Sequence, residues 1–396
     1  KILAVQIPRA AEKLRRLMNL AQITQSHALA FFHLSSPDLL LGWDSNPASR
    51  NVFGLMAAEP ELARGGIRLR QFGQQIIELL GARKIHAAWA VPGGVRSPLS
   101  AEGCEWIRDR VPESLATIEH ALGLFKGLLD NLQTEVRVFG NFPSLFMSLV
   151  GKDGEWEHYG GHIRFTDSNG NIVADNLSED DYQQYIGEAV EPWSYLKFPY
   201  YKPLGYPDGI YRVGPLARLN ICDRIGTPKA DRELQEFRQR AGGVATSSFF
   251  YHYARLVEIL AAIERIAELV EDPELRSPHT RAKAGINCLD GIGVSEAPRG
   301  TLFHHYQVDE DGAIAKVNLI IATGHNNLAM NKTIAQIAQH YIHNGDVAEG
   351  FLNRVEAGIR AFDPCLSCST HAAGQMPLRI QLVGKDGSIL QEICRD

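Results

Sequence analysis

The sequence predicts an α+β fold, in which a bundle of long helices carries small peripheral antiparallel sheets. Two observations lead to this prediction. Apolar residues recur at helical spacing over several long stretches, and shorter stretches alternate apolar and polar residues around turn-forming Asn, Asp and Gly. We expect a single domain over residues 1–371, with β-hairpins inserted at about residues 140–180 and 290–323.

The helical stretches come first in the chain and return towards its end. The first begins at Pro8, where a proline is tolerated, and continues to Leu34 with leucines at helical spacing. A strongly amphipathic stretch over residues 249–272 predicts another helix. The remaining predicted helices cover residues 59–80, 114–136, 327–344 and 346–361. Helices of this length favour a bundle.

Three stretches predict β-hairpins with tight turns. "GGHIRFTDSNGNIVADNL" alternates around SNGN, and "TLFHHYQVDEDGAIAKVNLIIAT" turns at Asp309–Gly312. The tail, "PLRIQLVGKDGSILQEI", turns at GKDG.

Composition excludes several classes of protein. The chain has 396 residues, is 45% hydrophobic and 22% charged, and carries a formal net charge of −6. This length suffices for a large core, and the charge predicts no general attraction to nucleic acid or anionic membranes. No apolar run approaches the roughly 20 residues of a membrane span. The sequence shows no secretory signal and only sparse cysteines, so we expect a reducing, cytoplasmic location.

The clearest chemical motif is "AFDPCLSCSTHAAGQ", residues 361–375. Cys365 and Cys368 are spaced so that both thiolates can bind one metal ion, and His371 adds a nitrogen donor. The same spacing suits a redox dithiol, or simply two buried cysteines. A zinc ribbon would need a second cysteine pair, and a thioredoxin-like dithiol would follow a strand rather than a predicted helix.

Two residues before the cysteine pair strengthen the metal interpretation. Asp363 and Pro364 form a rigid turn that ends the preceding helix, and a carboxylate beside metal-bound thiolates can relay protons. Taken alone, Asp363 could be an ordinary turn residue and His371 a surface histidine. Their coincidence with the cysteine pair favours a site.

From these residues onward the sequence resembles a known family. "DPCLSCSTHA" looks like the C-terminal metal motif of [NiFe]-hydrogenase large, catalytic subunits, and other segments resemble that family in the same order. Those segments are "KLRRLMNLAQITQSHALAFFHLSSPDLLLG", "WSYLKFPY", "YRVGPLARLN", "GVSEAPRGTLFHHY" and "NLIIATGHNNLAMN". The resemblance covers essentially the whole chain and is strongest to the soluble, bidirectional NAD-reducing type.

The resemblance implies a nickel–iron centre. Cys365 would be a terminal nickel ligand, and Cys368 would bridge nickel and iron. Thiolates are soft ligands, which agrees with these metals. The iron would also carry cyanide and carbon monoxide, and His371 would help to form a third site for magnesium or iron.

The resemblance also assigns residues around the metals. Arg299 would lie over the open side of the metal pair, with Asp38 as its charged partner, although an ordinary buried ion pair is the alternative. Pro298 and Thr323 would surround the diatomic ligands of the iron. Histidines on apolar faces are more often core residues, and we leave four of them out of the site: His27, His33, His304 and His305.

The chain departs from the family pattern at both ends. The family needs two more cysteines in an N-terminal motif, which we expect upstream of Lys1, so the chain as given would not complete the centre. Residues 372–396 resemble the extension of an unprocessed precursor, which an endopeptidase removes after nickel insertion. The alternative is a C-terminal hairpin that is never cut.

The predicted function is therefore that of the large subunit of a cytoplasmic, NAD-linked hydrogenase. H2 would be split heterolytically, with Cys365 or Arg299 taking the proton. The implied partners are a small iron–sulfur subunit, flavin-containing diaphorase subunits that bind NAD, nickel-insertion chaperones and the maturation endopeptidase. This chain shows no iron–sulfur, flavin or NAD motif of its own. The alternative is a hydrogenase-like protein, or a subunit of a related electron-transfer complex, that has lost the full metal site.

Overall fold

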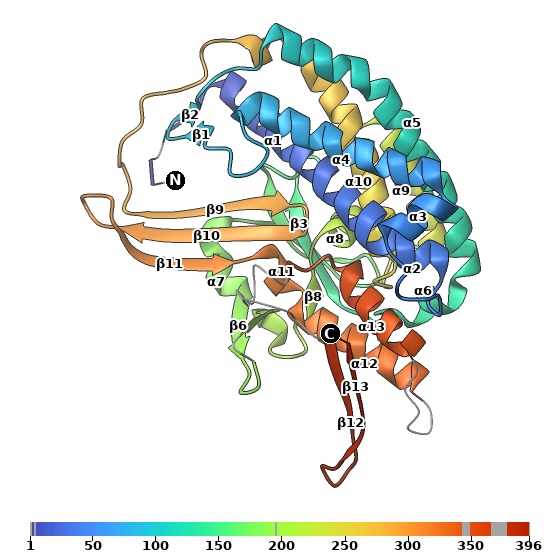
Figure 1. Cartoon of the computed structure of the whole chain (residues 1–396). Coiled ribbons are helices and arrows are strands. Elements are labelled where there is room, and N and C mark those ends of the chain that lie inside the picture. The colour runs from blue at the N-terminus through green and yellow to red at the C-terminus, as the bar shows by residue number, and fades with distance from the viewer. Residues whose placement is uncertain (1, 4, 195, 343–348, 366–377, 396) are drawn as a thin grey trace.

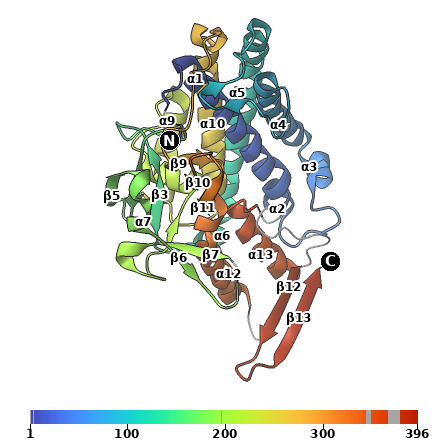
Figure 2. The ribbon, with the colours of Figure 1, turned by 90° about the vertical axis from the view of Figure 1, so that its left-hand side faces the viewer.

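The computed structural model describes residues 2–3, 5–194, 196–342, 349–365 and 378–395. The α+β prediction is confirmed, since long helices lie side by side on one side of the molecule and small sheets lie on the other (Figure 1, Figure 2). The helices are α1 (Arg9–Ala28), α2 (Ser36–Leu41), α3 (Val52–Ala58), α4 (Pro60–Gly81), α5 (Ala101–Asn131), α6 (Gln133–Val138), α7 (Tyr182–Tyr185), α8 (Pro215–Ile221), α9 (Pro228–Ala241), α10 (Phe250–Val270), α11 (Ala322–His325), α12 (Asn327–Tyr341) and α13 (Glu349–Ala361). The strands are β1 (Ala90–Val91), β2 (Gly94–Val95), β3 (Leu145–Val150), β4 (His162–Thr166), β5 (Ile172–Leu177), β6 (Ile186–Val190), β7 (Lys197–Tyr201), β8 (Tyr211–Arg212), β9 (Asp290–Ala297), β10 (Gly300–Val308), β11 (Ile314–Ile320), β12 (Leu378–Val383) and β13 (Ile389–Arg395). Among the helices of these ranges, none combines the length and the hydrophobicity needed to cross a lipid bilayer.

Helix α10 is the centre of the bundle and packs against α1, α5, α8 and α9. Every residue from Phe250 to Ile263 is buried, as a helix surrounded by others requires. Three of these buried residues are polar and fall at a spacing of three, which places them along one side of the helix. They are His252, Arg255 and Glu258. Because buried polar groups need partners, this stripe marks the side of α10 that serves more than packing.

Helix α1 ends differently from the predicted single helix over residues 8–34. The α-helix stops at Ala28 and continues as a wider π-helical turn over Leu29–Ser35, after which α2 begins. Ser36 donates both its N–H and its hydroxyl to the Phe31 carbonyl. Pro37 follows in the first turn of α2 and has no N–H with which to extend a regular ladder. The widened turn is followed by Asp38, which is buried.

The boundaries predicted for the third helix, residues 114–136, are wrong at both ends. Helix α5 begins at Ala101, where the Ser100 side chain accepts the N–H of Gly103, and it passes through Pro112 to Asn131. The remaining residues form the separate helix α6. Pro112 inside the helix concealed its true start, because proline normally ends a helical pattern.

The predicted hairpins are confirmed as β4–β5, β10–β11 and β12–β13. Two of them belong to larger sheets with the strand orders β5-β4-β3-β8 and β11-β10-β9. A second apolar cluster lies between these two sheets, apart from the main core of the bundle. The β9-β10-β11 sheet extends from the body beside the N-terminal end of the chain (Figure 1).

A tight turn, Pro298–Arg299, joins β9 to β10, with Ala297 opposite Gly300. The turn lies against the chain just before α8. A Cβ atom on Gly300, whose φ is +140°, would lie 2.3 Å from Val213 Cγ2. A Cβ atom on Gly214, whose φ is +94°, would lie 2.7 Å from the Arg299 carbonyl oxygen. Both positions require glycine, and the close approach fixes the turn beside α8.

Candidate active site

The segment that leads into the cysteine motif turns sharply after α13. Asp363 adopts a left-handed backbone with φ +52°, and its N–H bonds to the Arg360 carbonyl at 2.9 Å. Pro364 then directs the chain to Cys365, whose N–H bonds to Thr323 Oγ1 at 3.4 Å. Thr323 lies in the short helix α11, so this bond joins the predicted metal ligand to the segment that follows β11.

Arg299 reaches this turn from the other side. Its Nε donates to the Asp363 carbonyl at 2.6 Å, and its Nη2 lies 3.3 Å from Asp363 Oδ1. The Asp363 side chain is 5% exposed and that of Arg299 is 28% exposed. The structure thus brings together four of the predicted site residues, namely Arg299, Thr323, Asp363 and Cys365.

The Asp363 carboxylate is only half used. Its Oδ2 atom is buried and makes no hydrogen bond. Burial raises the pKa of Asp363, against the opposing charges of Arg255 and Arg299. A buried oxygen without a partner is costly unless something else contacts it, so this atom indicates a place for a further group.

The predicted ion pair between Arg299 and Asp38 is wrong. Asp38 accepts hydrogen bonds from Arg50 Nε at 3.0 Å and from Arg360 Nη1, while Arg299 bonds to Asp363. The cause is topological, since Asp38 lies in α2 against the last turn of α13, and Arg299 lies on the hairpin turn opposite the residues that follow α13. Burial raises the pKa of Asp38 although both arginines oppose it.

Arg255 supports the same turn from beneath. It is 1% exposed, and its Nη2 donates to the Ala361 carbonyl at 2.7 Å. A cation at the C-terminal end of a helix is favourable, because the last carbonyls carry partial negative charge. Arg255 and Arg360, neither of which was assigned from the sequence, thus hold the end of α13 from which the cysteine segment departs.

Arg218 holds the opposite side of the site. Its guanidinium donates to the carbonyl oxygens of Ala297 and Pro298, each at 3.0 Å. It also pairs with the buried carboxylates of Glu258 and Glu296. Sequence reasoning noticed its segment, "YRVGPLARLN", only as a resemblance, because partners so far apart in the chain leave no local pattern.

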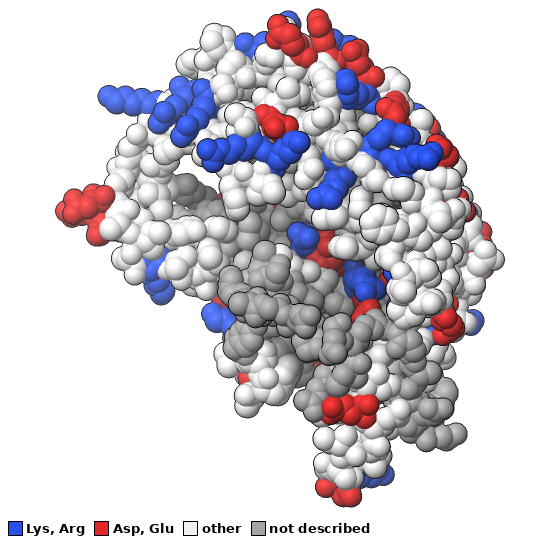
Figure 3. Space-filling view, in the orientation of Figure 1, with Lys and Arg blue, Asp and Glu red and all other residues white. Residues whose placement is uncertain are grey.

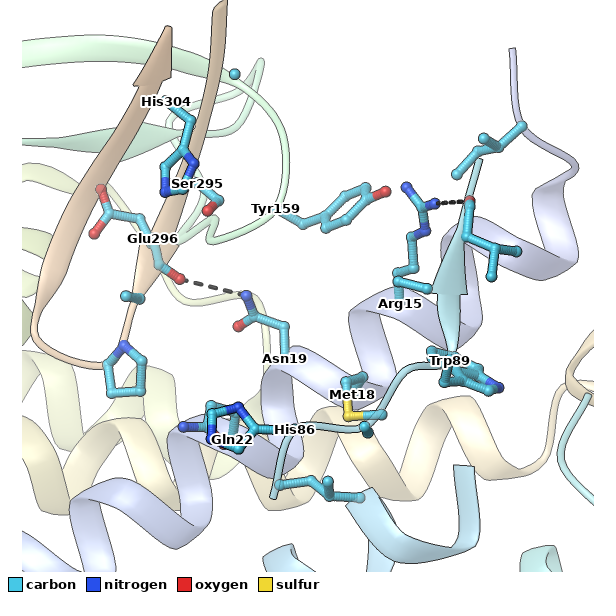
Figure 4. A pocket seen from close by; sticks show the side chains of 18 of the residues that line it. Arg15, Met18, Asn19, Gln22, His86, Trp89, Tyr159, Ser295, Glu296 and His304 are labelled. Carbon is cyan, nitrogen blue, oxygen red and sulfur yellow. Dashed lines mark hydrogen bonds between the residues drawn. The ribbon is translucent and has the colours of Figure 1, made fainter. Parts of the chain in front are cut away.

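A cavity of about 1300 Å³ opens beside Pro298 and Arg299. It lies between α1 and α4 on one side and β9 and β10 on the other, and Asn19 bridges the two sides through a 3.3 Å bond to the Glu296 carbonyl (Figure 4). Lys and Arg side chains gather on the helical side of the same face (Figure 3). The cavity leads from the surface to the residues that hold the site.

The histidines excluded from the site have other partners or surroundings. His27 is fully buried, and its Nε2 lies 2.8 Å from Glu258 Oε2. His304 bonds to Tyr306, and His305 bonds to Tyr182 and Asp290. Burial lowers the pKa of His33.

Cys368 and His371 lie outside the described residues. Within the described part of the chain, no group of three or more His, Cys, Asp or Glu side chains could hold a metal ion. The residues that are described nevertheless fit a soft metal, because the Cys365 segment lies beside Arg299 and Asp363 offers an unused buried oxygen.

The comparisons with known proteins agree with this geometry. Residues 156–371 match the family described as nickel-dependent hydrogenase. The chain is 40% identical to the beta subunit of the NAD-reducing hydrogenase HoxS of Cupriavidus necator, over 99% of this chain and 82% of that protein. The chain belongs to the nickel-dependent hydrogenase family. It is a hydrogenase large subunit, and its family implies a nickel–iron centre.

Other relatives support the same assignment. The chain is 40% identical to the F420-non-reducing hydrogenase vhu of Methanococcus voltae, over 84% of this chain and 79% of the matching protein. A crystal structure of an NAD+-reducing [NiFe]-hydrogenase in the H2-reduced state has a TM-score of 0.90 and 46% identity, covering 93% of this chain and 82% of that one. The [NiFeSe]-hydrogenase of Dm. baculatum has a TM-score of 0.73 at 19% identity, which shows the shared fold.

Buried histidines beside the site predict acid sensitivity. Burial, reinforced by the charge of Arg255, lowers the pKa of His252 from 6.5 to about 3. The unfolded chain therefore takes up a proton at His252 below pH 6.5 while the folded chain does not, and stability is lost as the pH falls from 6.5 towards 3. His252→Phe should reduce the loss between pH 6.5 and 4 by up to about 1.4 kcal/mol per pH unit, measured by denaturant unfolding.

The control for this prediction is Phe249→Leu, whose ring centroid lies 5.6 Å from that of His252. It should lower the free energy of unfolding by a similar amount at every pH. An unchanged pH dependence in His252→Phe would show that His252 does not stay neutral in the fold.

Proposed function

We propose that this chain is the catalytic large subunit of an NAD-linked hydrogenase that splits H2 heterolytically and reversibly. The observation that carries the proposal is the convergence of Cys365, Thr323 and the Arg299–Asp363 pair at one turn. The NAD link is supported by the 40% and 46% identity to proteins described as NAD-reducing hydrogenases.

Cys365 and Cys368 would hold the nickel, with Cys368 also bridging to iron, and His371 would contribute to a third site for magnesium or iron. When bound, the nickel–iron centre supplies the heterolytic cleavage of H2. The Thr323 hydroxyl already accepts the Cys365 N–H, so its own hydrogen is left to donate to an anionic ligand such as cyanide on the iron. Pro298 would border the same ligands.

Arg299 and Asp363 would supply the charge and the proton acceptor. Two contacts to Asp363 hold the guanidinium in place, and a cation fixed in a partly dry site stabilises negative charge that develops beside it. Asp363 Oδ2 remains available to accept a proton. In this scheme Asp38 acts at a distance, because it fixes the last turn of α13 through Arg360.

The electron path would leave this chain. Six scattered cysteines with one close pair provide no iron–sulfur motif, so we place the clusters in a small partner subunit, with NAD bound by flavin-containing diaphorase subunits. We also place the assembled enzyme in the cytoplasm. A hydrogenase-like subunit without the metal centre is the competing function, and it is favoured by the lack of a complete ligand group among the described residues.

Nickel content separates these two functions. When the chain is expressed with partner subunits and maturation factors, we expect about one nickel per chain by elemental analysis, and loss of nickel in Cys365→Ser. Cys288→Ser, which changes an exposed cysteine, should keep the metal. A wild-type protein that lacks nickel while its partners are bound would establish the competing function.

Arg299→Lys tests the proposed role of the guanidinium. Lysine cannot make both contacts to Asp363, so H2 turnover should fall by about 100-fold or more while the nickel content stays unchanged. Arg240→Lys, which alters an arginine paired with Glu236 near the surface, should retain full turnover. Normal turnover in Arg299→Lys would remove Arg299 from the mechanism.

We further propose that residues 372–396 are removed during maturation. The β12–β13 hairpin projects from the body (Figure 1), and its Val383, Ile389 and Leu390 side chains are exposed. Intact mass spectrometry of active protein should show a chain that ends at His371. Active protein that retains Asp396 would contradict this prediction.

A further inference from the structure

Arg218 is completely enclosed and uses every nitrogen of its guanidinium. Its side chain is 1% exposed. Nε and Nη2 bond to the two oxygens of Glu258 at 2.6 and 2.7 Å, and Nη1 bonds to Glu296 Oε2 at 2.8 Å. This arrangement needs the planar fork of arginine, which a lysine ammonium cannot reproduce.

The same guanidinium also grips the backbone of the hairpin turn. Nη1 donates to the Ala297 carbonyl and Nη2 to the Pro298 carbonyl, each at 3.0 Å. These are the last two carbonyls before Arg299. Because only the Arg299 backbone separates them from its side chain, the position of Arg218 limits where the Arg299 guanidinium can lie.

Both carboxylates that hold Arg218 are themselves anchored. Glu258 belongs to the central helix α10, and Glu296 belongs to β9. Every carboxylate oxygen has an additional partner, at distances from 2.7 to 3.0 Å: Glu258 contacts His27 and Trp156, and Glu296 contacts Leu149 and Thr301. Arg218 is therefore a rigid strut between the helical bundle and the turn.

We propose that Arg218 is a positioning residue for the hydrogenase reaction: it fixes the Pro298–Arg299 turn and thereby the place of the Arg299 guanidinium over the site. Arg218 does not touch the reacting atoms, and its effect passes through Arg299. The structural part of this inference stands on the contacts alone, and its consequence for turnover rests on the proposed function.

Amide hydrogen exchange tests the structural part in the full chain assembled with its partner subunits. Arg218→Lys should lower the protection of the amides of residues 299–302 by at least about 10-fold relative to the rest of β10. Arg164→Lys is the matched control, because Arg164 is also buried and also makes a bidentate pair, with Asp175, but has no contact with the turn. Equal loss of protection in both variants, or none in Arg218→Lys, would overturn the proposal.

A second variant covers the case in which Arg218→Lys does not fold. Glu296→Gln keeps acceptors for Leu149 and Thr301 but removes the charge that holds Nη1. It should loosen the same amides selectively. Unchanged exchange at residues 299–302 in this variant would count against the strut.

A double-mutant cycle tests the link to turnover. If Arg218 acts through Arg299, then Arg218→Lys should reduce H2 turnover in the wild-type background and cause no further loss in an Arg299→Lys background. Losses that multiply would show a role independent of Arg299. An inactive wild-type enzyme would refute the proposed function and leave the exchange result intact, so the two failures are distinguishable.

Discussion

The buried cluster of Arg218 with Glu258 and Glu296 is the interaction on which the arrangement of the site depends. It joins α8, the central helix α10 and the strand that leads into the Arg299 turn. Taking three charges out of water is costly, and removing one partner of such a group typically costs about 3–5 kcal/mol because the others remain buried. A cluster of this kind persists only when the surrounding packing holds each group in place. The apolar shell of the bundle does so here.

The site is built largely from arginines that hold backbone carbonyls and carboxylates. Arg218 holds the carbonyls before Arg299, Arg255 holds the Ala361 carbonyl, and Arg299 holds that of Asp363. These contacts fix two loops from distant parts of the chain in one place. They also make the surroundings of Cys365 electropositive, which favours the thiolate that metal binding requires.

The regular elements could be predicted from the sequence because their causes are local. Helical periodicity gave α4 and α10 within a few residues, and turn residues gave the hairpins. The end of α1 and the start of α5 could not be predicted, since Pro37 and Pro112 act through the geometry of the helices around them. The convergence of Cys365, Arg299 and Asp363 was expected from family resemblance. The partner of Asp38 was not predictable from either source, and neither was the role of Arg218, because both depend on which distant elements the fold places together.

The central claim is that a nickel–iron centre lies at the turn where Cys365 meets Arg299 and Asp363. X-ray diffraction of the assembled protein at the nickel absorption edge tests it most directly. We expect an anomalous peak beside the Cys365 sulfur, with the Arg299 guanidinium still bonded to Asp363. A nickel peak elsewhere in the chain, or a nickel-loaded protein in which Arg299 has left Asp363, would contradict this arrangement.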